Sequence, residues 1–389
     1  MDVTFLPVDI NKILKFIIIE LKKIANPSCI ILSGSFGKFS WLYYSNYCLS
    51  DLEITFISEK IWSFRKKKSL LKHLKKKFNI EVHIKGYLEN QIRKKIFSNY
   101  ANRYKGYISL NFYDTFFSPT IVYKVKENLD WLPCISISEV PIWEAWRLFT
   151  NRIAEILDNE LSNINKEENL ASYNYLKAFE SAFDSYLIIR RKYDPKLEKR
   201  IALLNQLNFE QIEKKEIIRS KSFKIIKRAL ISRQFHKLEN FKIEELTEKE
   251  RKITLLYWLE YIQNEMLISE GIIPELNGSK SLQYIRDKKI NNKYLETTLR
   301  NNILPSNILR LVKNPSLIMH GLIFKIFLTS WRHLILMTIN TIFTELVLEV
   351  TELPKTRILM EYLLGNKTIN NLTSDDLLKR IILYWKLLK

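Results

Sequence analysis

The alternation of polar and apolar side chains over residues 51–57 constrains the fold of this chain more than any other feature. The polar positions are Asp51, Glu53 and Thr55, and the apolar positions are Leu52, Ile54 and Phe56. Successive side chains of a β-strand point to opposite faces of a sheet, so the pattern predicts a strand with one buried face. Both carboxylates then lie on the other face, where they repel each other unless a cation lies between them.

Another strand is predicted just before this one, over the apolar residues Cys29–Leu32, and it ends at Gly34 and Ser35. Glycine lets a backbone approach a triphosphate closely, and a serine hydroxyl adds a hydrogen-bond donor. A third strand, Ile80–Lys85, carries Glu81 at an alternating position. The order is therefore strand, Gly-Ser turn, acidic strand and a further strand with an acid.

Three acids, Asp51, Glu53 and Glu81, are the candidate catalytic residues and metal ligands. Hard divalent cations prefer carboxylate oxygens and leave coordination positions for substrate phosphates. We therefore expect Mg²⁺ or Mn²⁺ as the cofactor and an NTP as the substrate. In a two-metal site, one ion activates the acceptor hydroxyl and the other stabilises the leaving pyrophosphate.

The arrangement resembles the signature of the DNA polymerase β-like nucleotidyltransferase superfamily. That superfamily shows a Gly-Ser turn, then Asp-x-Asp or Asp-x-Glu on a strand, then a third acid on a later strand. The run Ser-Gly-Ser-Phe-Gly-Lys at residues 33–38 is similar to prokaryotic, notably archaeal, members with a C-terminal helical region. The resemblance covers roughly the first third of the chain. It implies that the three acids bind metal and that Gly34 and Ser35 contact the triphosphate.

Two lysines are further candidates for phosphate binding. Lys38 follows the Gly-Ser turn, where it can neutralise phosphate charge or remain a solvated turn lysine. Lys177 lies on the polar side of a later predicted helix, with Tyr173 and Ser181 one turn to either side. In two-domain nucleotidyltransferases such helices close over the nucleotide, so by analogy Lys177 is a candidate triphosphate contact. An ordinary surface ion pair is the favoured alternative for Lys177.

The sequence also departs from the superfamily pattern. Phe39 stands where a glycine is common, and the second and third acids are Glu53 and Glu81 rather than the commoner Asp. A catalytically inactive member is therefore one alternative. A simpler alternative places Asp51 and Glu53 on the solvent face of an edge strand, with Glu81 pairing with His83 on the surface.

Helical periodicity surrounds these strands. Apolar residues recur at helical spacing over Ile10–Ile24, and helices are predicted at Ile61–Phe78, Ser138–Leu157 and Ala171–Arg190. From Leu197 onward almost every segment is predicted to be helical. The expected fold class is α+β, with a nucleotidyltransferase-type mixed α/β domain followed by a large all-α region.

Three domains are predicted from this change of pattern. Residues 1–133 would form the catalytic domain, residues 134–236 a helical domain packing on the active-site cleft, and residues 237–389 a C-terminal helical domain. A chain of 389 residues is long enough for two or three domains.

The net charge of +20 suggests an anionic partner but identifies none. Lys outnumbers Arg by more than two to one, which indicates a compositional bias as much as a binding surface, because phosphate-binding surfaces favour Arg. The lysine runs at residues 66–68 and 75–77 are interpreted as a solvated helix face, with phosphate contact as the alternative. Nucleic acid is therefore a weakly supported partner, and the NTP is the better supported one.

Targeting signals and membrane spans are not expected. The N-terminus lacks a basic region followed by an apolar run, and charged residues and histidines interrupt the apolar stretch Leu317–Val350. The widely spaced Cys29, Cys48 and Cys134 predict reduced thiols and a cytoplasmic location. Four histidines lack acids or cysteines at ligand spacing, namely His73, His236, His320 and His333, so no zinc site is predicted.

Three functions remain open from the sequence. The first is a nucleotidyltransferase that moves an NMP from an NTP to an unidentified acceptor hydroxyl on a small molecule, protein or RNA. The second is a catalytically degenerate module of the same fold that binds nucleic acid or a partner protein through its basic helical region. The third is a structural helical protein with an unrelated α/β domain.

Overall fold

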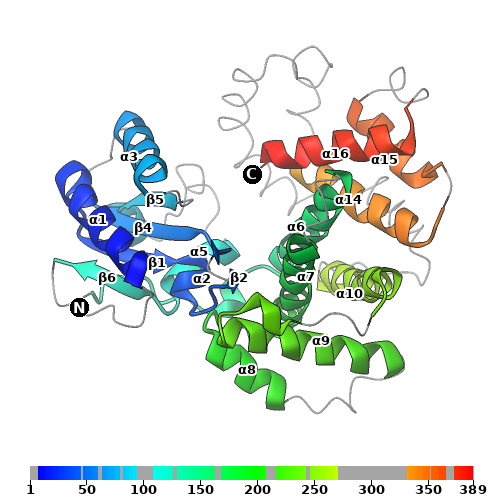
Figure 1. Cartoon of the computed structure of the whole chain (residues 1–389), viewed down its shortest axis with the longest axis horizontal. Helices are drawn as coiled ribbons and strands as arrows, with labels where there is room; N and C mark the ends of the chain where they lie inside the picture. The colour runs from blue at the N-terminus through cyan, green and yellow to red at the C-terminus, as the bar shows by residue number, and fades with distance from the viewer. Residues whose placement is uncertain are drawn as a thin grey trace. The chain divides into compact units, whose positions relative to one another are not determined.

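In a computed structural model, the chain forms a mixed α+β fold with a small sheet and many helices, which confirms the α+β part of the expected fold class (Figure 1). The structure describes residues 8–44, 47–59, 64–78, 82–93, 108–125, 129–162, 168–206, 216–241, 246–269, 331–350, 352–364 and 372–388. These residues fall into two compact units. Unit 1 comprises Met1–Pro141, Arg191–Lys214 and Lys227–Phe241, and unit 2 comprises Ile142–Arg190, Lys215–Ile226 and Lys242–Lys389.

Each unit combines separated stretches of the chain, whereas the predicted domains 1–133, 134–236 and 237–389 are continuous. The later stretches of unit 1 contact the segment that follows the Gly-Ser turn. The backbone N–H of Leu197 donates to the carbonyl of Lys38 at 3.2 Å. The guanidinium of Arg233 donates to the carbonyl of Ser40 at 2.9 Å. Such long-range contacts cannot be recognised from local periodicity.

The sheet of unit 1 contains four strands in the order β5-β4-β1-β6. The strands are β1 (Cys29–Ser33), β4 (Leu52–Ser58), β5 (Val82–Leu88) and β6 (Thr120–Lys124). Strand β1 pairs antiparallel with β4 and β6, and β4 pairs parallel with β5. The three predicted strands are confirmed, apart from residues 80 and 81, which lie outside the described residues. Strand β6 was not predicted.

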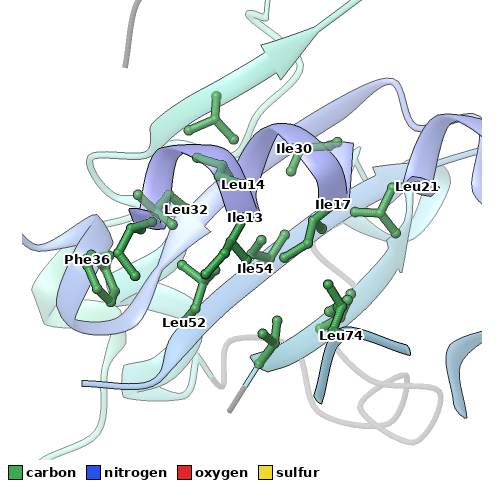
Figure 2. Packing of buried hydrophobic residues seen from close by; sticks show 14 of the residues in the cluster. Ile13, Leu14, Ile17, Leu21, Ile30, Leu32, Phe36, Leu52, Ile54 and Leu74 are labelled. Atoms are coloured by element: carbon green, nitrogen blue, oxygen red, sulfur yellow. The ribbon is translucent and has the colours of Figure 1, made fainter. Parts of the chain in front are cut away.

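Helices α1 (Val8–Ala25) and α3 (Phe64–Phe78) cover one face of the sheet (Figure 2). Their apolar residues meet the alternate residues of β1, β4 and β5 that point to this face. The buried side chains drawn and labelled there are Ile13, Leu14, Ile17, Leu21, Ile30, Leu32, Phe36, Leu52, Ile54 and Leu74. Their burial stabilises the unit by roughly 1.5–3 kcal/mol for each large side chain. The predicted buried face of residues 51–57 is therefore confirmed.

The opposite face of the sheet contacts helix α5 (Leu110–Phe116), where Tyr87 packs edge-on against Phe112 and Phe116. Ser109 caps the start of this helix, since its side chain accepts from the N–H of Phe112. Shorter elements complete unit 1. They are α2 (Gly34–Gly37), β2 (Tyr43–Tyr44), β3 (Tyr47–Cys48), α4 (Glu89–Arg93), the 3₁₀ helices Ile137–Glu139 and Leu238–Asn240, and α8 (Leu197–Gln206).

Unit 2 is helical in its described residues. Its helices are α6 (Trp143–Leu161), α7 (Glu168–Ile189), α10 (Glu248–Ser269), α14 (Trp331–Val347), α15 (Pro354–Leu364) and α16 (Ser374–Leu388). Helix α9 (Glu216–Gln234) spans residues of both units. Buried polar contacts join these helices, such as Asn340 to Thr150 at 3.0 Å and Ser185 to the carbonyl of Ala145 at 2.9 Å.

The predicted helices at Ser138–Leu157 and Ala171–Arg190 correspond to α6 and α7, with shifted ends. Pro354 is the first residue of α15, a position where proline is tolerated in a helix. Within the described segments, no helix combines the length and the apolar character that crossing a bilayer requires.

Candidate functional site

The Gly-Ser turn stands at the end of β1. Gly34 has a φ of +60°, a left-handed conformation that glycine adopts without a steric penalty. A Cβ atom at this position would lie 2.5 Å from Oε1 of Glu53, so a side chain here would force the Glu53 side chain to move. The next residue, Ser35, accepts the backbone N–H of Ser40 at 2.8 Å through its carbonyl. The turn and one predicted metal ligand are therefore in direct contact.

Asp51 and Glu53 lie on the same face of the sheet, as predicted. Asp51 immediately precedes β4 and is exposed, whereas Glu53 lies within β4 and is half-buried. In the sheet register Glu53 is opposite Ser33 on β1 and opposite His83 on β5. The third predicted acid, Glu81, lies outside the described residues.

Two basic residues of β5 face these acids. The Nε2 atom of His83 lies 3.8 Å from Oδ2 of Asp51, and the Nζ atom of Lys85 lies 3.7 Å from Oε2 of Glu53. All four side chains retain about a third to a half of their exposure, so water weakens both interactions. Sequence reasoning noted His83 but overlooked Lys85, although its alternation with His83 along the strand placed it on this face.

The two acids suit a hard cation by ligand type, since both offer carboxylate oxygens from one face of a strand. The side chains of Asp51 and Glu53 are 53% and 35% exposed, which leaves them open to water and substrate. Among the described residues, no group of three His, Cys, Asp or Glu side chains is placed to hold a metal ion. Of the three predicted metal ligands, the structure thus describes Asp51 and Glu53.

A buried hydrogen bond supports the acidic strand. The hydroxyls of Ser33 and Thr55 lie 2.8 Å apart, between β1 and β4, on the face that carries Glu53. Both residues are almost fully buried. A buried polar pair of this kind fixes the relation of two strands because neither group has water as an alternative partner.

Lys38 is held by an internal ion pair. Its Nζ atom lies 2.5 Å from Oδ2 of Asp114 and donates to the hydroxyl of Tyr193 at 3.2 Å. The same hydroxyl donates to Oδ1 of Asp114 at 3.0 Å. To act as the predicted phosphate contact, Lys38 would have to leave this carboxylate. Asp114 and Tyr193 come from distant segments, and no spacing in the sequence pointed to them.

A second lysine, Lys196, supports the same turn region beside Phe39. Its Nζ atom donates to the carbonyl of Gly37 at 2.9 Å and to the hydroxyl of Thr120 at 2.7 Å. The ammonium also lies 4.5 Å from the centre of the Phe39 ring. Burial lowers the pKa of Lys196, opposed by the nearby carboxylates of Asp194 and Glu198.

Phe39 has a φ of +57°, in the left-handed region. This is the position at which the superfamily pattern favours glycine. The backbone therefore has the conformation that glycine suits, although a side chain is present. A bulky residue in this conformation costs about 1–2 kcal/mol, which the packing around Phe39 must offset.

Lys177, the remaining predicted phosphate contact, belongs to unit 2. Its Nζ atom lies 2.7 Å from Oε2 of Glu155 and 4.9 Å from the centre of the Tyr173 ring. Glu155 also accepts from Arg152 at 2.7 Å. Lys177 thus belongs to a local cluster of ion pairs, which is the alternative that the sequence favoured for this residue.

Compared with known proteins, the chain matches no family model and no curated protein.

Proposed function

We propose that unit 1 is a metal-dependent nucleotidyltransferase centre that transfers an NMP from an NTP to an acceptor hydroxyl. The observation that carries the proposal is the contact between Gly34 and Glu53. It brings the predicted phosphate-binding turn and the predicted metal-binding strand to one point. The order of turn, acidic strand and following strand agrees with the superfamily pattern described above.

The acids would hold the metal. Asp51 and Glu53 are the described ligands of the proposed site, and Glu81 is proposed as the third. When bound, Mg²⁺ would neutralise triphosphate charge and favour ionisation of the acceptor hydroxyl. Two partly exposed carboxylates on one face are a suitable donor set, because hard divalent cations prefer carboxylate oxygens.

The remaining residues of the turn would position the triphosphate. Gly34 lets the backbone approach the phosphates because it carries no side chain, and Ser35 offers a hydroxyl donor. We propose that Lys38 stabilises the turn region and does not contact the phosphates, because Asp114 already neutralises its charge. The overall reaction joins the acceptor oxygen to the α-phosphorus and releases pyrophosphate.

One observation favours the second candidate function, a degenerate module without catalysis. Lys85 and His83 place positive or protonatable groups beside Glu53 and Asp51, at 3.7 Å and 3.8 Å. Such groups reduce the repulsion between the acids without a metal ion. In that case the same turn would bind nucleotide weakly, without transfer.

Transfer can be tested even though the acceptor is unidentified. The full chain is incubated with Mg²⁺, an NTP labelled at the α-phosphate, and the separated RNA, protein and small-molecule fractions of a cell extract. The proposal predicts label in one fraction, lost with EDTA and in the double variant Asp51→Asn, Glu53→Gln. The matched control is Glu59→Gln, an exposed acid just after the other end of β4.

The two candidate functions give different results in this assay. Label that depends on both acids supports the transferase. Nucleotide binding without transfer of label to any fraction supports the degenerate module and contradicts the proposed activity.

A further inference from the structure

Helix α3 has an unusual charge composition. Its basic residues are Arg65, Lys66, Lys67, Lys68, Lys72, Lys75, Lys76 and Lys77, and it contains no Asp or Glu. Lys66, Lys68, Lys72, Lys75 and Lys76 are all exposed. An ordinary surface helix mixes both signs, because oppositely charged residues three or four positions apart stabilise it.

Among the described residues, three of these lysines also have no carboxylate near them. Across the part of the chain that the structure describes, no carboxylate lies within ion-pairing distance of Lys68, Lys72 or Lys76. The three residues follow one another at intervals of four, so each repels the next. Every such like-charge pair destabilises the helix by about 0.2–0.5 kcal/mol. The charge therefore costs stability that the fold alone does not explain.

The apolar side of α3 is already used in the core. Leu70 and Leu74 are buried against α1 and the sheet, together with Ile17 and Leu21 of α1 (Figure 2). Leu71 and Phe78 also pack against this core, so the described side chains of α3 leave no apolar stripe to insert among lipid chains, which an amphipathic membrane-binding helix requires. A polar, linear polyanion is the better match to the exposed side.

The exposed lysines form a row rather than a pocket. At 1.5 Å of rise per residue, Lys68, Lys72 and Lys76 repeat at about 6 Å along the helix. A free triphosphate would need ammonium groups that converge on one point. A row of this kind fits the repeating phosphates of a nucleic acid strand.

Residues of α1 extend this surface beside the row. His73 stacks on Phe16 with ring centres 5.5 Å apart, and Lys77 lies 4.0 Å from the centre of the same Phe16 ring. Lys12, one turn before Phe16, is exposed. Aromatic and cationic groups side by side are typical of surfaces that bind nucleic acid strands.

We propose that the outer side of α3, with the adjoining part of α1, binds the phosphate backbone of a nucleic acid strand without reading its sequence. The surface uses none of the residues of the proposed transferase centre. Nucleic-acid binding by this surface therefore does not depend on the transferase activity. Lys68, Lys72 and Lys76 carry the main contacts.

The test measures binding of the full chain to a fluorescently labelled single-stranded RNA by anisotropy over a series of salt concentrations. The variant Lys68→Gln, Lys72→Gln, Lys76→Gln is expected to bind roughly tenfold to hundredfold more weakly. Its salt dependence should be shallower by about 2 in the slope of log K against log salt, at about 0.7 for each lost phosphate contact. Unlabelled DNA strands should compete with the RNA.

A charge-matched control separates this surface from the overall charge of +20. Lys192→Gln, Lys199→Gln, Lys237→Gln removes the same charge from exposed positions of unit 1 and should leave binding near the wild-type value. The α3 variant should fold at least as well as the wild type, because it relieves like-charge repulsion.

Three results would overturn the proposal. They are wild-type RNA binding that does not weaken with salt, equal losses in the two triple variants, and α3-dependent binding of phosphatidylserine vesicles in the absence of RNA binding.

Discussion

The side chain of Glu53 occupies the space that a side chain at Gly34 would need. A Cβ atom on Gly34 would lie 2.5 Å from Oε1 and 2.7 Å from Cδ of Glu53. Gly34 also has a φ of +60°. Backbone conformation therefore favours glycine at this position, and a side chain here would also displace the Glu53 side chain. The contact joins the two segments on which the proposed function depends.

Gly34→Ala is expected to destabilise the protein by about 2 kcal/mol, measured as the free energy of unfolding in urea. Left-handed backbone accounts for about 1–2 kcal/mol of this, and the clash with Glu53 for the rest. In a Glu53→Ala background the clash is absent, so the cost of Gly34→Ala should fall to the backbone contribution. An equal cost in both backgrounds would show that Glu53 does not contact Gly34.

Lys85→Gln is expected to strengthen Mg²⁺-dependent nucleotide binding by a factor of about three to ten. The ammonium lies 3.7 Å from the Glu53 carboxylate, and a positive charge beside a cation site opposes the ion by about 1 kcal/mol in a water-like environment. Titration calorimetry with and without Mg²⁺ measures the effect. Weaker binding in this variant would instead make Lys85 a phosphate contact.

Asp114→Asn is expected to lower the free energy of unfolding by about 2 kcal/mol. It leaves Lys38 without its carboxylate in a site where the two side chains are only 20% and 10% exposed. Glu20→Gln serves as the control, because it breaks the more exposed pair with Lys23 and should cost less than about 0.5 kcal/mol. Equal costs would mean that the Lys38 pair behaves as a surface ion pair.

The stability of the protein is expected to fall in mild acid because of His236. Its ring stacks on Trp41 with centres 3.9 Å apart, and burial, helped by the charge of Arg233, lowers the pKa of His236 below its ordinary 6.5. As the pH falls below 6.5, the unfolded chain binds this proton before the folded chain does. The stabilisation is therefore complete above pH 6.5 and is lost as the pH falls through the folded pKa.

His236→Asn tests this pH dependence. Asparagine tolerates the left-handed backbone at this position, where φ is +57°, so the variant removes the ionisable ring without adding backbone strain. The free energy of unfolding of the variant should vary less with pH across this window than that of the wild type. Identical pH profiles would assign the dependence to other groups.

Local patterns predicted the first strands and helices correctly. Strand β1 was recognised from a short apolar run and strand β4 from strict alternation. Each position that points into the core needs an apolar residue, so local sequence is enough to show these strands. Strand β6 was missed, since its pairing with β1 joins Ile121 to Ile31 across a long stretch of chain. Its residues, Thr-Ile-Val-Tyr-Lys, do carry the β-branched composition of a strand.

The side chains that support the region of the Gly-Ser turn were harder to predict. Asp114, Tyr193, Lys196 and Thr120 meet the turn only in three dimensions, and no spacing in the sequence connects them. At Phe39 the residue type and the backbone conformation disagree. The sequence departs from the expected glycine, yet the backbone keeps the left-handed conformation. Long-range packing can thus impose a conformation that the residue type disfavours.

We propose that Asp51 and Glu53 bind the metal ion that accompanies the nucleotide. Titration calorimetry of the full chain with ATP, in the presence and absence of Mg²⁺, tests this claim most directly. We expect Mg²⁺ to strengthen ATP binding and the double variant Asp51→Asn, Glu53→Gln to lose about tenfold or more in affinity. The Glu59→Gln control should bind as the wild type does. Mg²⁺-dependent ATP binding that is unchanged in the double variant would contradict the metal site and the function built on it.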